Sequence, residues 1–405
     1  MNIMINTRPN IAAKKRNNRG NLFMRAPPFR RSRHSAGRTN LAGHFQPTVR
    51  FNRYYIIARL SSCPCNRHFR GMEKSEFIMP PRCNNHLGRM RKVGFEIEMQ
   101  GDLLGVARSV VEIFGGELIA YNSFIYQILD TEYGDITVEL DSSVLKDQRY
   151  KQFLKNVGVD ADYLGVGEMV EKTLAKIAGT FVPHEIVLPP VPLDRLQIIQ
   201  QLERALRQRQ VKGTRTSLLY AFSLQINPDI PSSEPRILVD YLKAFLLLYD
   251  WLFKVSEIDL TRRISPYINE FPAAYCRQAL DPAYRPELST FIDDYLKHNP
   301  TRNRPLDLLP LFAFLDEARV RQHPVEQHLV KPRAAFHYRL PNCQIDEPEW
   351  SAAKEWNRWV QVERLAAAPD KIDAMSRDYF DTVSSATNGN IEAWIAKTAD
   401  WIESS

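Results

Sequence analysis

Two glutamates, separated by a single residue, lie in a strand-like segment of the sequence. In Phe95–Met99 the apolar residues alternate with Glu96 and Glu98, so both carboxylates fall on one face of a strand, roughly 7 Å apart. Like charges at this spacing repel each other unless a cation lies between them, and acidic residues are depleted in strands. The pair therefore suggests a site that binds a cation.

Side chains of related chemistry occupy the polar positions of four further strand-like segments. Hydrophobic residues alternate there with Thr137, Glu139 and Asp141; with Glu185; with Ser223, Gln225 and Asn227; and with Arg333, His337 and Arg339. Mg²⁺ prefers carboxylate oxygens and keeps substrate phosphates as further ligands, whereas arginine forks bind phosphate or carboxylate oxygens. These residue types indicate a cation site that faces a phosphate site. The alternative is the solvated polar face of a half-exposed antiparallel sheet.

Strands and helices are expected to be interspersed along the chain. Alternating hydrophobicity predicts strands at 89–100, 117–129, 135–140, 184–188 and 333–340, with Pro189 and Pro190 closing the fourth. Residues 217–226 are expected to form a strand or a strand-like loop. Helical periodicity predicts helices at 103–114, 166–177, 193–209, 236–255, 308–319, 352–365, 372–380 and 391–402. Residues 259–310 are expected to form an irregular insertion around one helix at 287–297. Neither a P-loop nor a dinucleotide-binding glycine motif is present.

Six motifs in a fixed order make this sequence resemble the amidoligase family. They are GFEIEM at 94–99, TVELDSS at 137–143, HEIVLPP at 184–190, FSLQINP at 222–228, NPTRNRPLDLLP at 299–310 and RAAFHYRLPNC at 333–343. The family is related to glutamine synthetase and glutamate–cysteine ligase, and the resemblance spans residues 89–365. It implies an α+β fold, a glutamine-synthetase-like catalytic domain in which helices pack on the outer face of a curved antiparallel sheet and the active site lies in its cup.

The resemblance also implies a reaction. ATP, bound through Mg²⁺, would phosphorylate a substrate carboxylate, and an amine would then displace phosphate to give an amide. The substrates would be a small-molecule or peptide carboxylate and an amine, neither of which the sequence identifies. Phosphoryl transfer depends on positioned cations more than on a covalent nucleophile. The acids of this sheet face would bind metal cations, and its arginines are themselves cationic.

Roles for individual residues follow from the resemblance. It implies that metal is bound by Glu96, Glu98, Glu139 and Glu185, and that catalysis involves Glu96, Glu139, Asp141 and Arg339. The nucleotide or its phosphates would contact Gln225, Asn227, Arg302, Arg304, Arg333 and Arg339. Gln225 stands where related enzymes often have the histidine of an H-x-N pattern, which puts metal binding by this residue in doubt. Alternatively, Asp141 could cap a turn, and Arg302 and Arg304 could brace a loop.

Positive charge is concentrated in the N-terminal segment. Residues 1–71 contain 15 of the 54 Lys and Arg residues and none of the 47 Asp and Glu residues, so the rest of the chain is net negative. Such a segment fits a transit peptide, a nucleic-acid-binding arm, or upstream sequence that precedes the true start codon. We favour the third interpretation, with the true start at Met72. We expect a disordered tail over 1–88, a catalytic domain over 89–365 and C-terminal helices packed on it over 366–405.

Several classes of protein are excluded by the composition. The chain has no apolar run long enough to span a bilayer, and its five cysteines are scattered without the spacing of a zinc site. We therefore expect a cytoplasmic protein without a membrane anchor, which could be oligomeric. Two alternatives to a ligase stay open: a divalent-metal hydrolase or nuclease that uses the same acids, and a non-catalytic sheet protein whose basic arm binds nucleic acid.

Overall fold

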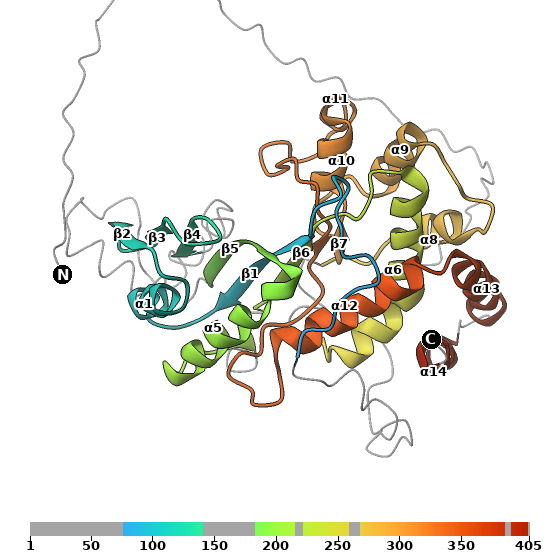
Figure 1. Cartoon of the computed structure of the whole chain (residues 1–405). Coiled ribbons are helices and arrows are strands. Elements are labelled where there is room, and N and C mark those ends of the chain that lie inside the picture. Colours follow the sequence, from blue (N-terminus) through green and yellow to red (C-terminus); the bar gives the residue numbers. More distant parts are fainter. Residues whose placement is uncertain (1–75, 141–182, 215–221, 259–267, 385–389, 404–405) are drawn as a thin grey trace, which may run out of the picture. The chain divides into compact units, whose positions relative to one another are not determined.

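Eight strands form one antiparallel sheet in the computed structural model, which describes residues 76–140, 183–214, 222–258, 268–384 and 390–403 (Figure 1). The order across the sheet is β2-β3-β4-β5-β1-β6-β8-β7, and every neighbouring pair is antiparallel. The strands are β1 (Lys92–Met99), β2 (Glu117–Asn122), β3 (Ile125–Leu129), β4 (Ile136–Leu140), β5 (His184–Pro192), β6 (Leu224–Pro228), β7 (Leu306–Asp307) and β8 (His337–Tyr338). The expected α+β fold with an antiparallel sheet is confirmed.

Ten α-helices accompany the sheet in the described part of the chain. They are α1 (Leu103–Phe114), α5 (Gln197–Gln208), α6 (Pro235–Val255), α8 (Ala273–Leu280), α9 (Leu288–His298), α10 (Leu309–Leu315), α11 (Glu317–Arg321), α12 (Ala352–Ala366), α13 (Pro369–Tyr379) and α14 (Ile391–Glu403). A 3-10 turn spans Leu193–Arg195 and a π-helical turn spans Phe380–Ser384. None of the helices described here combines the length and apolarity needed to cross a membrane.

The apolar face of β1 lies at the centre of the hydrophobic core. Val93, Phe95, Ile97 and Met99 are at most 4% exposed and pack in one cluster with residues of α1, α5, α6 and α12. In the view of Figure 1, α1, α5 and α12 run below β1 and β5, on one side of the strands. Because side chains alternate between the two faces of a strand, the polar positions of β1 point away from this core.

The sequence marks both ends of α1. The Asp102 carboxylate accepts a hydrogen bond from the backbone N–H of Gly105 at 3.0 Å, which caps the first turn. Gly115 follows the last turn with a φ of 71°, a conformation that glycine adopts without steric cost. The predicted helix over 103–114 is therefore confirmed at both boundaries.

A fully buried ion pair joins the residue before β1 to α12. The Arg91 guanidinium donates to both oxygens of Glu363 at 2.6 and 2.7 Å, and both side chains are 0% exposed. The Tyr241 hydroxyl and the Trp359 indole also donate to this carboxylate, at 3.0 and 2.7 Å. Burial opposes the charge on Arg91, but Glu363 outweighs it and raises the pKa of Arg91. The pair is charged and well hydrogen-bonded.

Residues 76–88, which we assigned to the tail, pack against α12 and β1. The backbone N–H of Ile78 donates to the Asn357 side chain at 3.0 Å, and the Trp356 indole donates to the Ile78 carbonyl at 2.8 Å. The Phe77 ring meets the Phe95 ring edge-on, with centroids 6.3 Å apart. The packed part of the chain thus includes residues from 76 onward. Residues 1–75 and the predicted helix at 166–177 lie outside the described residues.

Strand β5 continues through two prolines, although we expected it to end before them. It pairs with β1 as far as Pro192, and this pairing has a register shift between Val93 and Phe95. On its other side, β5 pairs with β4 only as far as Val187. Pro189 and Pro190 therefore lie past the end of that second pairing and beside the irregularity in the first, where a missing N–H is tolerated.

Other boundaries differ from the prediction because individual hydrogen bonds interrupt a segment whose hydrophobic residues are regularly spaced. The segment 117–129 is a hairpin, β2–β3, whose turn is closed by the backbone N–H of Phe124 donating to Asn122 at 2.8 Å. The helix expected over 308–319 breaks at Asp316, which caps α11. The strand expected over 333–340 is reduced to β8. The N–H of Arg333 donates to the Pro310 carbonyl of α10 at 3.0 Å, and that of Arg339 donates to the Pro305 carbonyl before β7 at 2.9 Å. The insertion at 259–310 contains α8 besides the expected α9.

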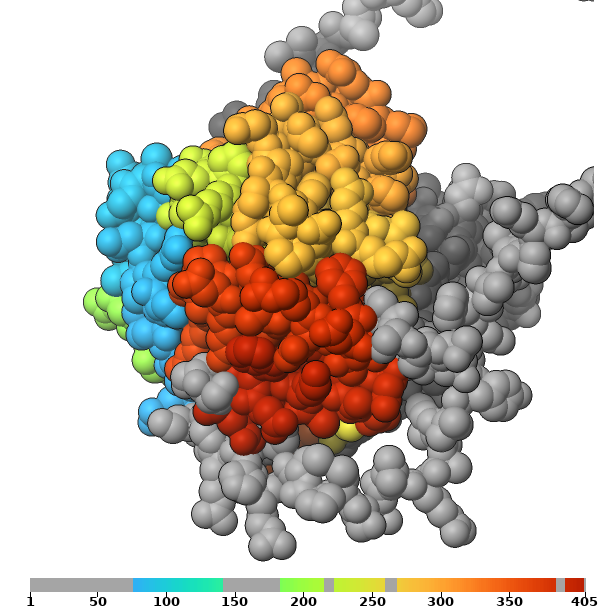
Figure 2. Space-filling model, turned by 90° about the vertical axis from the view of Figure 1, so that its right-hand side faces the viewer, coloured from blue at the N-terminus to red at the C-terminus, as the bar shows by residue number. Residues whose placement is uncertain are grey.

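The C-terminal helices α13 and α14 pack against α6. The Trp394 side chain of α14 is 0% exposed, and its indole donates to the Leu247 carbonyl of α6 at 3.1 Å. The Arg285–Asp373 ion pair, 2.8 Å long, joins α13 to the loop between α8 and α9. Figure 2 shows the C-terminal residues, in red, directly beside the orange surface, which is formed by residues that follow α6 in the sequence.

Candidate active site on the polar face of the sheet

Three carboxylates stand in one row across neighbouring strands. Glu139 of β4 is directly opposite Glu185 of β5, which is in turn opposite Glu98 of β1. Directly opposed residues of antiparallel strands share a face, with Cβ atoms about 5 Å apart. All three side chains are half-buried. The row therefore collects negative charge on the face that lies away from the core.

A fourth carboxylate, Glu96, lies two residues before Glu98 on the same face of β1. Its Oε1 accepts a hydrogen bond from the Asn227 side-chain amide at 3.1 Å and an ion-paired bond from Arg333 at 3.3 Å. The Arg333 side chain is 38% exposed. The carbonyl oxygen of the Asn227 amide is buried, and within the described residues it has no hydrogen-bond partner. An acceptor of this kind would bind a cation or a donor of a ligand.

The charge of Glu96 is maintained by its neighbours. Burial alone would raise its pKa, but His337, Arg333 and Arg339 together lower the pKa of Glu96 below its ordinary value. Burial lowers the pKa of His337 itself to about 4, so this ring is neutral at neutral pH. At neutral pH the two guanidinium groups therefore supply the positive charge that holds Glu96 ionised.

Glu98 accepts hydrogen bonds from β6 and from Ser223, the residue before it. The backbone N–H of Ser223 donates to its Oε2 at 2.8 Å, and the Gln225 amide donates to its Oε1 at 3.1 Å. The carbonyl end of Gln225 lies 2.7 Å from Nε2 of His337, which is 2% exposed. Each of the two side-chain amides of β6 thus donates a hydrogen bond to one of the two glutamates of β1.

Asp307 belongs to this cluster, although sequence reasoning missed it. It is 0% exposed, and its Oδ2 lies 3.3 Å from Nδ1 of His337 and 3.0 Å from Nε of Arg302. Burial would raise its pKa, but the contact with His337 and the charge of Arg302 lower the pKa of Asp307. The only sequence signal was a lone aspartate within the LDLLP part of the fifth motif.

The remaining arginines separate into two groups. Arg339 donates to the Arg302 carbonyl at 2.7 Å, and Arg302 donates to the Leu329 carbonyl at 2.9 Å, so both are anchored beside His337. Arg304 instead donates to Asn299 at 2.8 Å and to the Glu270 carbonyl at 2.6 Å, within the insertion. These bonds fit the bracing alternative for Arg304, and we leave this residue out of the proposed site. Asp141 lies outside the described residues.

The donor chemistry of this face fits magnesium. Glu96, Glu98, Glu139, Glu185 and the unpartnered oxygen of Asn227 are all hard oxygen donors. Within the described ranges, no three acidic, histidine or cysteine side chains are gathered closely enough to hold a metal ion by themselves. Mg²⁺ is commonly held by one or two carboxylates together with substrate phosphates, and the face offers such carboxylates.

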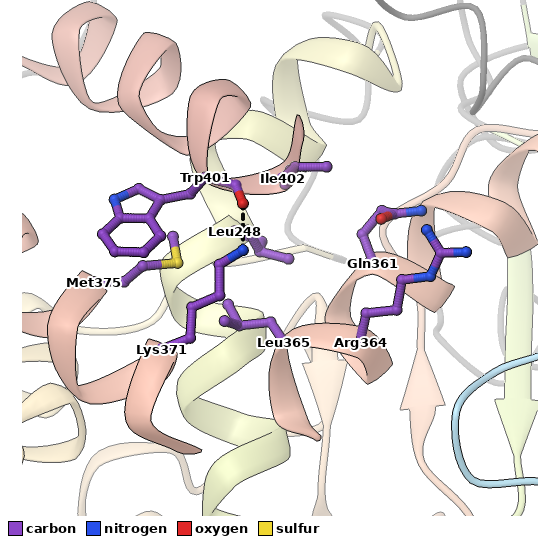
Figure 3. A pocket seen from close by; sticks show the side chains of 8 residues that line it. All are labelled: Leu248, Gln361, Arg364, Leu365, Lys371, Met375, Trp401 and Ile402. Atoms are coloured by element: carbon purple, nitrogen blue, oxygen red, sulfur yellow. Dashed lines mark hydrogen bonds between the residues drawn. The ribbon is translucent and has the colours of Figure 1, made fainter. Parts of the chain in front are cut away.

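A pocket elsewhere contains none of the predicted site residues. It lies among α6, α12, α13 and α14 and has room for roughly one water molecule. Figure 3 shows Lys371 reaching across it to donate to the Trp401 carbonyl, at 2.5 Å. Its size excludes it as a nucleotide site.

Fold and site together define a class of protein: an α+β domain whose antiparallel sheet presents carboxylates, amides and arginines on one face. A family model described as "Putative amidoligase enzyme" matches residues 89–361, and the chain belongs to this family. The resemblance seen in the six motifs is thereby confirmed, and membership indicates a ligase. No curated protein and no solved structure matched the chain.

Proposed function

We propose that the protein is an ATP- and Mg²⁺-dependent carboxylate–amine ligase, which forms an amide or peptide-like bond through an acyl phosphate. The observation that carries this proposal is the juxtaposition, on one sheet face, of the Glu139–Glu185–Glu98 row with Glu96 and its guanidinium neighbours. Family membership supports the reaction class. A glutamine-synthetase-like arrangement, with the site in the cup of a curved sheet, is part of the proposal.

Mg²⁺ would be held by Glu96, Glu98, Glu139 and Glu185 together with phosphate oxygens of ATP, and its charge would neutralise the phosphates during transfer. The Asn227 amide oxygen, buried and without a partner among the described residues, would accept a donor from the nucleotide or contact the metal. Gln225 would act through its bond to Glu98.

Arginines would stabilise the phosphoryl group as it moves. Arg333 is the most accessible guanidinium of the cluster and has a single contact to Glu96. Its fork suits the oxygens of a phosphoryl group. Arg339 and Arg302 would add positive charge while remaining bonded to their carbonyl partners. The transferred phosphoryl group carries its negative charge on its peripheral oxygens. Guanidinium groups beside these oxygens would therefore lower the barrier to phosphoryl transfer.

The reaction balances in two steps. A substrate carboxylate oxygen bonds to the γ-phosphorus of ATP while the bond to the β–γ bridging oxygen breaks, giving ADP and an acyl phosphate. The amine nitrogen then attacks the acyl carbon, phosphate leaves with the electrons of its carbon–oxygen bond, and the amine loses a proton. We assign the holding of the amine or of a water to Asp141, next to β4 in the sequence.

Trapping with hydroxylamine tests the proposal without knowledge of the natural amine. Hydroxylamine converts an acyl phosphate into a hydroxamate, which forms a coloured complex with iron(III). Amino acids and short peptides would be screened as carboxylates with ATP and Mg²⁺. We expect an ATP-dependent hydroxamate signal that falls at least about 100-fold in Glu96→Gln, because Glu96 supports the charge arrangement of phosphoryl transfer.

The matched control is Glu117→Gln, on the exposed start of β2, which should leave the rate unchanged. Thermal unfolding of both variants shows whether the fold is intact. A normal rate in Glu96→Gln would contradict the proposal. Metal-dependent cleavage of phosphodiesters without ATP would favour the hydrolase alternative instead.

A further inference from the structure

A path of close polar contacts crosses four neighbouring strands and ends at Glu98. It runs from Asp307 of β7 through His337 of β8 and Gln225 of β6 to β1, in the order in which these strands lie in the sheet. The His337 ring lies 3.3 Å from Asp307 and 2.7 Å from the Gln225 carbonyl oxygen. The Gln225 amide nitrogen lies 3.1 Å from Glu98 Oε1.

The direction of these bonds follows from which groups can donate. A carboxylate accepts, so Gln225 must turn its NH₂ group toward Glu98 and its carbonyl toward His337. The carbonyl cannot donate, so Nε2 of His337 must carry the hydrogen. In a neutral imidazole Nδ1 is then an acceptor. Burial, which lowers the pKa of His337 to about 4, keeps the ring neutral at neutral pH.

Arg302 removes the alternative arrangement. A neutral histidine could otherwise carry its hydrogen on Nδ1, give it to Asp307 and accept from a flipped Gln225 amide. Nη2 of Arg302 lies 3.3 Å from Nδ1 and can only donate, so it opposes a hydrogen on that atom. Asp307 in turn holds Arg302 through Nε at 3.0 Å. One tautomer and one amide orientation are thus selected.

We propose that His337, set by Arg302 and Asp307, is a positioning residue that fixes the Gln225 amide and through it the Glu98 carboxylate. Its value for catalysis rests on the proposed function, in which Glu98 binds metal. The Asn227 amide has no comparable bond to its carbonyl oxygen within the described residues. The two β6 amides therefore differ: Gln225 is fixed from behind, whereas Asn227 keeps an acceptor for a ligand.

Two substitutions of His337 separate positioning from packing. In His337→Gln the side-chain amide reaches the place of Nε2 and can donate to Gln225. In His337→Asn it reaches only the place of Nδ1, so the Gln225 carbonyl loses its donor. Binding of Mn²⁺ alone would be measured by electron paramagnetic resonance. We expect a dissociation constant about tenfold higher in His337→Asn and within about twofold in His337→Gln, because the hydrogen bond that orients the Gln225 amide toward Glu98 is lost only in the first.

Nitrogen NMR on the unchanged chain, labelled with ¹⁵N-histidine, provides a readout that needs neither metal nor substrate. The His337 signal is the one absent from both variants, and at pH 7 we expect hydrogen on Nε2 and none on Nδ1. Hydrogen on Nδ1, or equal weakening of Mn²⁺ binding by both substitutions, would overturn the positioning role. If the unchanged chain binds no Mn²⁺ and no Mg·ATP, the proposed function fails, while the tautomer still decides whether His337 fixes Gln225.

Discussion

Two histidines are buried deeply enough to stay neutral in the folded protein. His337 and His184 are 2% and 4% exposed, and burial lowers the pKa of each to about 4 from an ordinary 6.5. The unfolded chain would take up protons on both rings near the ordinary value, whereas the native state excludes them. Between these two pH values the unfolded state therefore binds more protons than the native state.

We expect this difference to make stability fall as the pH drops from 6.5 to 4. The free energy of unfolding rises with pH wherever the unfolded state binds more protons, by up to about 1.4 kcal/mol per pH unit for each histidine. Replacing His337 by glutamine removes one of the two contributions. Urea unfolding at intervals across this window should show a shallower dependence in His337→Gln than in the unchanged chain. Identical slopes would contradict a neutral, buried His337.

At the residue scale, what the sequence could predict depended on distance along the chain. The polar faces of β1, β4 and β5 follow from alternation within each strand, and these strands do place Glu98, Glu139 and Glu185 in one row. The bond between Gln225 and His337 joins residues 112 positions apart. It exists only because β6 and β8 are neighbours, and no local pattern encodes that pairing. Asp307 escaped notice for the same reason.

At the scale of elements, the buried Arg91–Glu363 pair connects the sheet to α12. Both side chains are 0% exposed, and Tyr241 and Trp359 donate to the same carboxylate. Such a pair adds little net stability as a whole, but breaking it leaves one charge buried without compensation. The strand and the helix are therefore strongly coupled at this point.

We expect Glu363→Ala to lower the free energy of unfolding by about 3–5 kcal/mol, because Arg91 would remain charged and buried. Urea unfolding followed by tryptophan fluorescence measures the change. The control is Glu349→Ala, whose carboxylate is 97% exposed and 3.8 Å from Lys354, and which should be indistinguishable from the unchanged chain. A loss below about 1 kcal/mol in Glu363→Ala would show that the junction tolerates an unpaired Arg91.

Element boundaries were harder to predict than elements. Helix α1, which has clear signals at both ends, was predicted to the residue. Strand β5 runs through two prolines because its pairing on one side has already ended, a property of its neighbours rather than of its own residues. The N–H groups of Arg333 and Arg339, on either side of β8, bond to the carbonyls of Pro310 and Pro305, which lie outside the strands. In both strands the boundary depends on residues from other parts of the chain.

At the scale of the whole molecule, the C-terminal helices complete the packing of α6. Trp394 of α14 is 0% exposed and bonds to the Leu247 carbonyl, whereas the carboxylate row comes from β1, β4 and β5. The packing at α14 and the carboxylate row therefore belong to different parts of the chain.

Trp394→Ala should cost about 3–5 kcal/mol of stability, as expected when a large aromatic side chain is removed from a core. Mn²⁺ affinity, measured well below the unfolding temperature, should stay within about twofold, since no site residue changes. Glu392→Ala on the same helix is the control, because its pair with Lys254 is exposed on both sides. Loss of Mn²⁺ affinity in folded Trp394→Ala would contradict this separation.

The link between Arg91 and Glu363 spans 272 residues. During synthesis, Arg91 leaves the ribosome long before its counter-charge exists, and the first strand must also await β5 and β6 to acquire its neighbours. Long-range pairings of this kind make folding slow, and they leave strand edges open to aggregation in the meantime. A nascent chain that stops short of α12 therefore cannot neutralise Arg91, and we expect such truncated products to be recognised by chaperones and proteases.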